Sequence, residues 1–379
     1  MDPVATAPPA ARQLLQLARR DRNAAEQALA ALSIEDQVAI VCEAPLGERG
    51  RILGLVSDPE ALIPALPPAE LCFTVKAIGL ADAAWVLEYA TPEQTVAALD
   101  LDAWRGNEVD LATANEWLQA FARTSPEAQV RVLEALDAEL LMLALRARIG
   151  VVQRPDDADG WSTPDGSQTL EGQFHYWALA DDDDLADVTA LLRALFESAY
   201  WSYFRLMHAI QWELTSDSEE WALRWRTGRL EDLGFPTWDD AMRIYRFLDP
   251  EARRALPPDA RPLETSEWQL PVSLPQLPQT GGAGDRVFDA IALLDEPERR
   301  ASFYALIALA NRVAVADRLP LGDAESTPTA IAKAARFASG GLAHLAAEHG
   351  LGDLEILRRV SLEHLFRVGA NLDSEGARS

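Results

Sequence analysis

The sequence predicts an all-α protein, from a recurring helix-start signature, apolar residues at helical spacing and a near-absence of strand-like alternation. In the signature a capping side chain is usually followed by Pro and then Glu. It occurs at Asp58-Pro59-Glu60, Thr91-Pro92-Glu93, Ser125-Pro126-Glu127 and Asp249-Pro250-Glu251, with looser versions at Ser33-Ile34-Glu35 and Pro67-Pro68-Ala69-Glu70. The capping oxygen accepts hydrogen bonds from unpaired amides, Pro at the first helical position loses no hydrogen bond, and Glu suits the helix dipole. We therefore expect many short helices with sharp beginnings.

Residues 1–150 are predicted to form an α-superhelix that resembles a solenoid. From about Ala10 to Arg148 nearly every segment has helical periodicity. Helices this short cannot bury their apolar faces alone and must stack on one another. The cap positions follow at unequal intervals, 34 residues from Ser33 to Pro67, 24 to Thr91 and 34 to Ser125. The repeat is therefore degenerate and does not match a tetratricopeptide array.

Residues 151–180 are predicted to be a loop and β-hairpin connector between two domains. Turn-forming residues gather here, among them Asp156, Gly160, Pro164 and Gly166. Gln173 to Trp177 has the composition of a short strand, one arm of a hairpin. We expect the domain boundary to lie in this segment.

Residues 181–379 are predicted to form a second helical domain. After the run Asp181 to Asp184, a long helix is expected over Leu185 to Leu214, and because it is apolar on more than one face we expect it at the centre of its domain. Residues 257–284 contain six prolines and end in Gly281-Gly282-Ala283-Gly284. This composition predicts an extended strap or linker.

The charge balance excludes several classes of partner. The chain has 379 residues, 49% of them hydrophobic, with 60 acidic against 34 basic residues and a net charge of −26. Nucleic-acid affinity comes largely from Lys and Arg contacts to phosphate, and anionic membranes attract basic segments. We expect neither kind of partner.

The sequence also predicts a cytoplasmic protein without membrane insertion. Met1 to Ala10 has no basic segment followed by an apolar one, and no uninterrupted apolar run approaches 18 residues. The two cysteines, Cys42 and Cys72, lie in apolar helical contexts without a CxxC motif or a nearby His. Both are expected to be buried free thiols.

Two resemblances add to this prediction. The segment from Leu66 to Gln94 resembles the helical superhelix of MgtE-type magnesium-channel N-domains and of flagellar-motor FliG proteins. From Trp225-Arg226-Thr227-Gly228-Arg229 to Asp249-Pro250, together with Thr74 to Gly79 and Leu99 to Trp104, the chain is identified as a member of an uncharacterised bacterial family, the domain-of-unknown-function family numbered 6178. The second resemblance implies a bacterial, cytoplasmic, helical protein and brings no activity or cofactor.

The densest candidate site lies between residues 219 and 232. Its predicted ligand-binding residues are Trp221, Arg224, Trp225, Arg226, Arg229, Glu231 and Asp232. Guanidinium groups that stack near indoles beside carboxylates can recognise an anionic ligand. The structural interpretation, which the sequence favours, is a buried ion-pair network that orders a helix-turn, with Gly228 ending the helix.

Other chemistry has weaker support. The Asp181 to Asp184 run could bind a divalent cation, but four consecutive Asp residues also suit a helix N-terminus. His344 and Glu348 share a helical face, for which a surface hydrogen bond is the commoner outcome, and His208 is expected in the interior. Pro271 to Pro278 contains a PxxP, for which a linker is the safer interpretation. We expect no catalytic residue, no resident metal and no cofactor.

The predicted function is therefore a non-catalytic scaffold or regulatory adaptor that presents a helical groove to a protein partner. A ligand sensor or enzyme with its site near residues 219–232 is the alternative. A divalent-cation sensor is a weaker one, which depends on the MgtE-like segment and the acidity.

Overall fold

The computed structural model describes residues 11–157, 160–180, 185–256 and 286–376. It is 71% helical, with 21 α-helices and two small antiparallel strand pairs within the described residues. The predicted all-α fold class is confirmed. The described chain divides into two compact units, residues up to Arg226 and residues from Thr227 onward. We call them the first and second units and describe each by itself.

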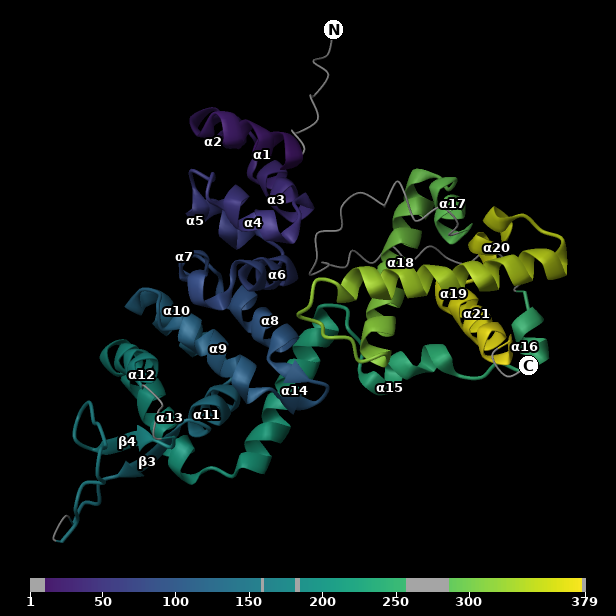
Figure 1. Cartoon of the computed structure of the whole chain (residues 1–379). Coiled ribbons are helices and arrows are strands. Elements are labelled where there is room, and N and C mark those ends of the chain that lie inside the picture. Colours follow the sequence, from purple (N-terminus) through teal and green to yellow (C-terminus); the bar gives the residue numbers. More distant parts are fainter. Residues whose placement is uncertain (1–10, 158–159, 181–184, 257–285, 377–379) are drawn as a thin grey trace. The chain divides into compact units, whose positions relative to one another are not determined.

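The first unit begins as a succession of short helices. They are α1 (Ala11–Arg20), α2 (Arg22–Ala30), α3 (Ile34–Glu43), α4 (Leu46–Leu53), α5 (Pro59–Leu62), η1 (Ile63–Ala65), α6 (Pro68–Ile78), η2 (Leu80–Asp82), α7 (Ala84–Leu87), α8 (Pro92–Asp102), α9 (Leu111–Phe121), α10 (Pro126–Ala135) and α11 (Ala138–Arg146). Each packs mainly on helices close to it in sequence: α4 on α6, α6 on α8, and α9 on α11 (Figure 1). Neighbour-to-neighbour packing of this kind is typical of helical arrays.

The predicted caps are present. Ser33, Asp58, Thr91, Ser125 and Asp249 each accept a hydrogen bond from a backbone amide in the first turn of the helix that follows. Thr91 forms a complete capping box with Gln94.

The looser signature at Pro67 has a different role. Helix α6 begins at Pro68 without a side-chain cap, and Glu70 is buried. The Glu70 carboxylate instead lies 2.6 Å from Arg49 Nη1, and Arg49 also donates to the carbonyl of Cys42. This buried ion pair ties α4 to α6.

Two short hairpins interrupt the helices. Strands β1 (Trp104–Arg105) and β2 (Glu108–Val109) form the first, and β3 (Ile149–Gln153) pairs antiparallel with β4 (Phe174–Ala178) in the second. The strand predicted at 173–177 is thus confirmed. A Cβ at Gly150 would lie 2.4 Å from the indole of Trp177, so only glycine fits opposite that side chain.

The second hairpin belongs to the first unit. Phe174 and Tyr176 of β4 are fully buried in the same core as the preceding helices. The sequence places a connector between domains at 151–180, whereas the compact units divide after Arg226. The difference arises because the two aromatic side chains hold this segment in the core.

The prediction of a single long helix over Leu185 to Leu214 is wrong. Two helices, α12 (Ala186–Ser198) and α13 (Tyr200–Trp212), are separated by Ala199, whose φ and ψ are −140° and 57°. They are followed by α14 (Thr215–Asp232), which runs through Gly228. Gly228 therefore does not end the helix, as the sequence predicted, and the chain turns at Gly234 with φ of 82°.

The second unit has a helical core of its own. It contains α15 (Trp238–Ala241), η3 (Met242–Tyr245), α16 (Pro250–Arg254), α17 (Arg286–Ala292), α18 (Glu296–Ala316), α19 (Ser326–His349), α20 (Asp353–Arg359) and α21 (Leu362–Gly376). Helices α19 and α21 pack along one another (Figure 1). They touch through backbone: a Cβ at Gly341 would lie 2.0 Å from the carbonyl oxygen of Leu365, and one at Gly369 would lie 1.9 Å from that of Phe337.

Several sequence expectations fall on undescribed residues. The Asp181 to Asp184 run, the proline-rich segment 257–284 with its PxxP, and the glycines at 281–284 lie outside the described residues. Within the described ranges no single helix has the length and apolar composition to cross a membrane, and one bent pair, Pro59–Ala65 with Pro68–Ile78, passes that test at an angle of 117°. Both cysteines are free and buried, as predicted.

Candidate functional site

The ligand-binding residues predicted from the sequence lie on α14, where some are on its exposed face and others on its buried face. Trp221 and Trp225 are 44% and 48% exposed, and their rings stack with centroids 5.9 Å apart. The guanidinium of Arg224 lies 5.1 Å from the Trp221 ring. These three side chains form an exposed aromatic and cationic patch. Glu231 and Asp232 are exposed in the last turn of the helix, and Arg229 is half-buried.

Arg226 has a different environment from Arg224. It is buried, with 8% exposure, and lies 4.8 Å from the ring of Trp104. Its Nε donates to the carbonyl of Asp100 at 2.8 Å and its Nη1 to that of Gly106 at 3.1 Å. Arg226 therefore anchors α14 to the end of α8 and to the β1–β2 hairpin, and the structure does not bring it together with Arg224.

A second exposed aromatic surface, which the sequence analysis did not predict, lies along α13. Trp201, Phe204, His208 and Trp212 follow one another at helical spacing, and each ring contacts the next, with centroids 6.0 to 6.5 Å apart. Trp201 is 72% exposed and Trp212 is 62% exposed. We call these four residues the aromatic row. His208 is exposed within it, so the interior position expected for this residue is wrong.

The opposite face of α13 fixes the row in place. Tyr203 is fully buried, and its hydroxyl donates to the Glu171 carboxylate at 2.8 Å. Burial first, and then the Glu171 carboxylate, raises the pKa of Tyr203 well above its usual range. The phenol is therefore neutral at any physiological pH and acts as a permanent donor that holds α13 against the hairpin.

A cavity of about 450 Å³ lies beside the aromatic row. It is formed by the end of α10, by α11, α12 and α13, and by the residue that follows α13. Its apolar lining includes Leu133, Leu136, Leu141, Leu195, Phe204 and Leu206, and its polar lining consists of Glu134, Glu139, Ser202, Arg205, His208 and Glu213. An apolar lining with a few convergent charges is typical of ligand pockets.

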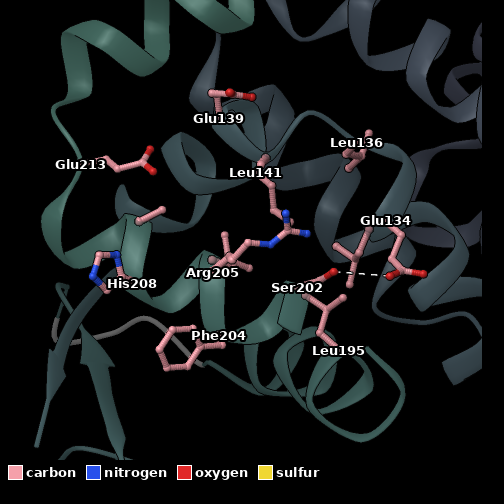
Figure 2. Close-up of a pocket in the computed structure, with 14 residues that line it drawn as sticks. Glu134, Leu136, Glu139, Leu141, Leu195, Ser202, Phe204, Arg205, His208 and Glu213 are labelled. Atoms are coloured by element: carbon pink, nitrogen blue, oxygen red, sulfur yellow. Dashed lines mark hydrogen bonds between the residues drawn. The ribbon is translucent and has the colours of Figure 1, made fainter. Parts of the chain in front are cut away.

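Arg205 occupies the middle of this cavity. Figure 2 shows its guanidinium with Glu134 on one side, His208 and Glu213 on the other, and Glu139 above. Of the three carboxylates only that of Glu134 accepts a hydrogen bond within the described chain, a long one of 3.4 Å from the Ser202 hydroxyl. Arg205 has no ion pair or hydrogen bond within the described part of the chain. A cation and three anions therefore face one cavity without neutralising each other.

The remaining candidates give no site. Among the described residues there is no group of three or more His, Cys, Asp or Glu side chains arranged to hold a metal ion. Glu348 pairs with Arg254 at 3.4 Å, so it does not act with His344 alone. Burial, and then the charge of Asp102, raises the pKa of the Cys72 thiol, which is the opposite of what a reactive cysteine needs.

Comparison with known proteins identifies the family of the chain. Residues 26–375 match the model of the family described as "Family of unknown function (DUF6178)". The chain belongs to this family. No curated protein and no solved structure matches the chain. The family assignment made from the sequence is confirmed, and it carries no activity to this protein.

Proposed function

We propose that this protein is a non-catalytic cytoplasmic adaptor that binds a basic segment of a partner protein on α13 and the start of α14. The observation that supports this function best is the set of exposed tryptophans on these consecutive helices, Trp201, Trp212, Trp221 and Trp225. All four lie in the first unit.

Exposed indoles at this density are costly in a chain that binds nothing. A buried aromatic side chain removes about 150–250 Å² of surface from water, at roughly 25 cal/mol per Å². Tryptophan and arginine also carry much of the binding energy in protein interfaces. The aromatic row on α13 and the patch of Trp221, Arg224 and Trp225 on the next helix, α14, therefore each have the composition of an interface centre.

The charge around these residues indicates a basic partner. Between Trp212 and Trp221 the chain carries Glu213, Asp217, Glu219 and Glu220 and no basic residue. Each of these four acidic residues is exposed. Complementary charge accelerates encounter and disfavours acidic partners. An amphipathic helix with apolar anchors and a lysine-rich edge suits this surface.

A matched pair of peptides tests the proposal. Two amphipathic helical peptides share one apolar face and carry either Lys or Glu on the polar edge, and fluorescence anisotropy reports their binding to the full chain. We expect the Lys peptide to bind and to weaken with added salt, and the Glu peptide not to bind. The double variant Trp201→Ser/Trp212→Ser should weaken binding about tenfold or more.

Trp85→Ser provides the control for this experiment. Trp85 is exposed to a similar degree as Trp221 but lies on α7. This variant should bind the Lys peptide as the unchanged chain does. Equal binding of both peptides, or equal loss in the Trp85 variant, would contradict the proposal.

The other two functions have less support. The ligand sensor at residues 219–232 needs several arginines at one point, and Arg226 is already bonded to two backbone carbonyls. The divalent-cation sensor depends on the MgtE-like segment from Leu66 to Gln94 and on the acidity of the chain, and the Asp181 to Asp184 run lies outside the described residues. Both stay as predictions from the sequence.

A further inference from the structure

We propose that the cavity between α10, α11, α12 and α13 binds a small zwitterionic ligand with an apolar side chain, of the class of free aliphatic or aromatic α-amino acids. This site adjoins the proposed adaptor surface and shares Phe204, His208 and Glu213 with it, but the inference does not rest on the adaptor function. The inference starts from the unpaired Arg205 and the three carboxylates that share its cavity.

The size and lining suit such a ligand. The cavity volume of about 450 Å³ falls within the usual range for small-molecule sites. Leu133, Leu141 and Leu195 supply an apolar wall, and Phe204 supplies an aromatic edge. A leucine-sized side chain placed there would lose its contact with water. A ligand without an apolar part would leave this wall wet.

The charge pattern selects for two opposite charges in one ligand. A simple cation would be attracted by Glu134, Glu139 and Glu213 but repelled by the central guanidinium of Arg205. A simple anion would be attracted by Arg205 but repelled by the three glutamates. A zwitterion can place its ammonium against a glutamate and its carboxylate on Arg205. There the carboxylate accepts two parallel hydrogen bonds from the planar guanidinium. The zwitterion thereby provides counter-charges for groups that have none in the described chain.

The position of Arg205 supports a binding role over a structural one. Phe204 and Leu206, its neighbours on α13, pack into the protein, whereas Arg205 is exposed and bonded to nothing described. Arg148 of the same unit, which does not line the cavity, shows the structural alternative: it is largely buried and forms an ion pair with Asp187. Replacement of Arg205 should therefore leave the fold intact.

Four related ligands test the chemistry one group at a time. L-Leucine carries all three features; leucinamide lacks the carboxylate, N-acetylleucine lacks the ammonium, and glycine lacks the apolar side chain. Leucinamide also mimics a peptide N-terminus and N-acetylleucine a peptide C-terminus, so the series separates a free amino acid from a chain end. Calorimetry or ligand-observed NMR on the full chain should show leucine binding about tenfold or more tightly than leucinamide, N-acetylleucine or glycine, and phenylalanine should bind as leucine does.

Matched variants locate the site. Arg205→Gln should weaken leucine binding about tenfold or more and abolish the preference for leucine over leucinamide. The triple variant Glu134→Gln/Glu139→Gln/Glu213→Gln should abolish the preference over N-acetylleucine. Arg193 and Glu197 are exposed residues of α12 that do not line the cavity. Arg193→Gln and Glu197→Gln should therefore leave the affinity for leucine and both ligand preferences unchanged. Melting temperatures of all variants should match the unchanged chain.

Three results would overturn the inference. They are no saturable binding of leucine or phenylalanine at millimolar concentration, binding that is equal for leucine and leucinamide, and binding that Arg205→Gln leaves intact. None of them affects the adaptor proposal, because that proposal is tested with the peptide pair and the tryptophan variants. Loss of peptide binding in the tryptophan variants with leucine binding unchanged would likewise leave this site standing.

Discussion

The contact between α19 and α21, which we call the crossing, and the outer face of α13 carry opposite kinds of side chain: glycines at the crossing and large aromatic rings on α13. In the second unit, Gly341 and Gly369 remove side chains so that two helices meet through their backbones. In the first unit, α13 keeps the rings of Trp201, His208 and Trp212 exposed on a face that the described chain does not cover. Close contact of backbones serves only stability, whereas uncovered rings cost stability. The comparison is consistent with the proposal that the crossing is retained for folding and the aromatic row for binding a partner.

The largest effect should come from adding one carbon at the crossing. In Gly341→Ala the new Cβ would lie 2.0 Å from the Leu365 carbonyl oxygen, and backbone cannot move aside as a flexible side chain can. We expect a loss of more than about 3 kcal/mol in unfolding free energy, measured by urea denaturation.

Gly340→Ala is the matched control for this variant. Its Cβ would meet only Gly369 Cα, at an ordinary 3.7 Å. Because alanine favours helix over glycine, this change should be neutral or stabilising by up to about 1 kcal/mol. Similar losses in both variants would mean that helix flexibility, and not close contact, explains the glycines.

Smaller losses of unfolding free energy, which differ between the buried and the exposed face, are expected for substitutions on α14. Arg226→Met removes charged hydrogen bonds to the carbonyls of Asp100 and Gly106 and leaves both without this donor, so we expect a loss of about 2–3 kcal/mol. Arg224→Met removes only an exposed stacking contact and should cost at most about 1 kcal/mol. Thermal and urea denaturation of the two variants provide the measurement. Equal losses would contradict the distinction between an anchoring face and a binding face.

Much of the fold could be predicted because its signals are local. The caps at Thr91 and Ser125 depend on three or four consecutive residues, and so they were found. The break at Ala199 has no Gly or Pro to mark it, and its backbone conformation depends on what α12 and α13 pack against.

The candidate site was harder to predict than the fold. An apolar helix in a sequence has the same pattern whether its rings are buried or exposed, so Trp201 and Trp212 were assigned to a domain centre. The cavity joins residues from Leu133 to Glu213, which no short motif connects. One signal was available: Arg205 is the only Lys or Arg between Tyr200 and Trp212, in an otherwise aromatic and apolar helix.

A pH-dependent effect is expected in the second unit. His364 of α21 is partly buried, and burial first, and then the charge of Arg367, lowers its pKa, against an opposing effect of Glu363. The unfolded chain therefore takes up the proton more readily than the folded chain. The stability contributed by neutral His364 is complete above its unfolded pKa, near 6.5, and is lost as the pH falls below that value. His364→Phe should make the unfolding free energy less sensitive to pH between about 7 and 5.

The control for this pH effect is a variant of an exposed histidine. His208 lies on the surface of α13, and His208→Phe measures what the loss of an exposed imidazole does to the same slope. An identical slope in the His364→Phe variant and the unchanged chain would assign the acid sensitivity to other groups.

The smallest effect on stability is expected at the aromatic row, and it tests the comparison most directly. Trp201→Ser and Trp212→Ser remove rings that contact solvent over most of their surface, so each should change the unfolding free energy by no more than about 0.5 kcal/mol. Trp117→Ser is the control: its ring is fully buried and its Nε1 donates to Asp102 at 2.9 Å, so we expect a loss of about 3–5 kcal/mol. If Trp212→Ser instead costs as much as Trp117→Ser, the row is part of the protein's own core. If it costs nothing and abolishes binding of the Lys peptide, the rings are retained for the partner, because folding does not require them.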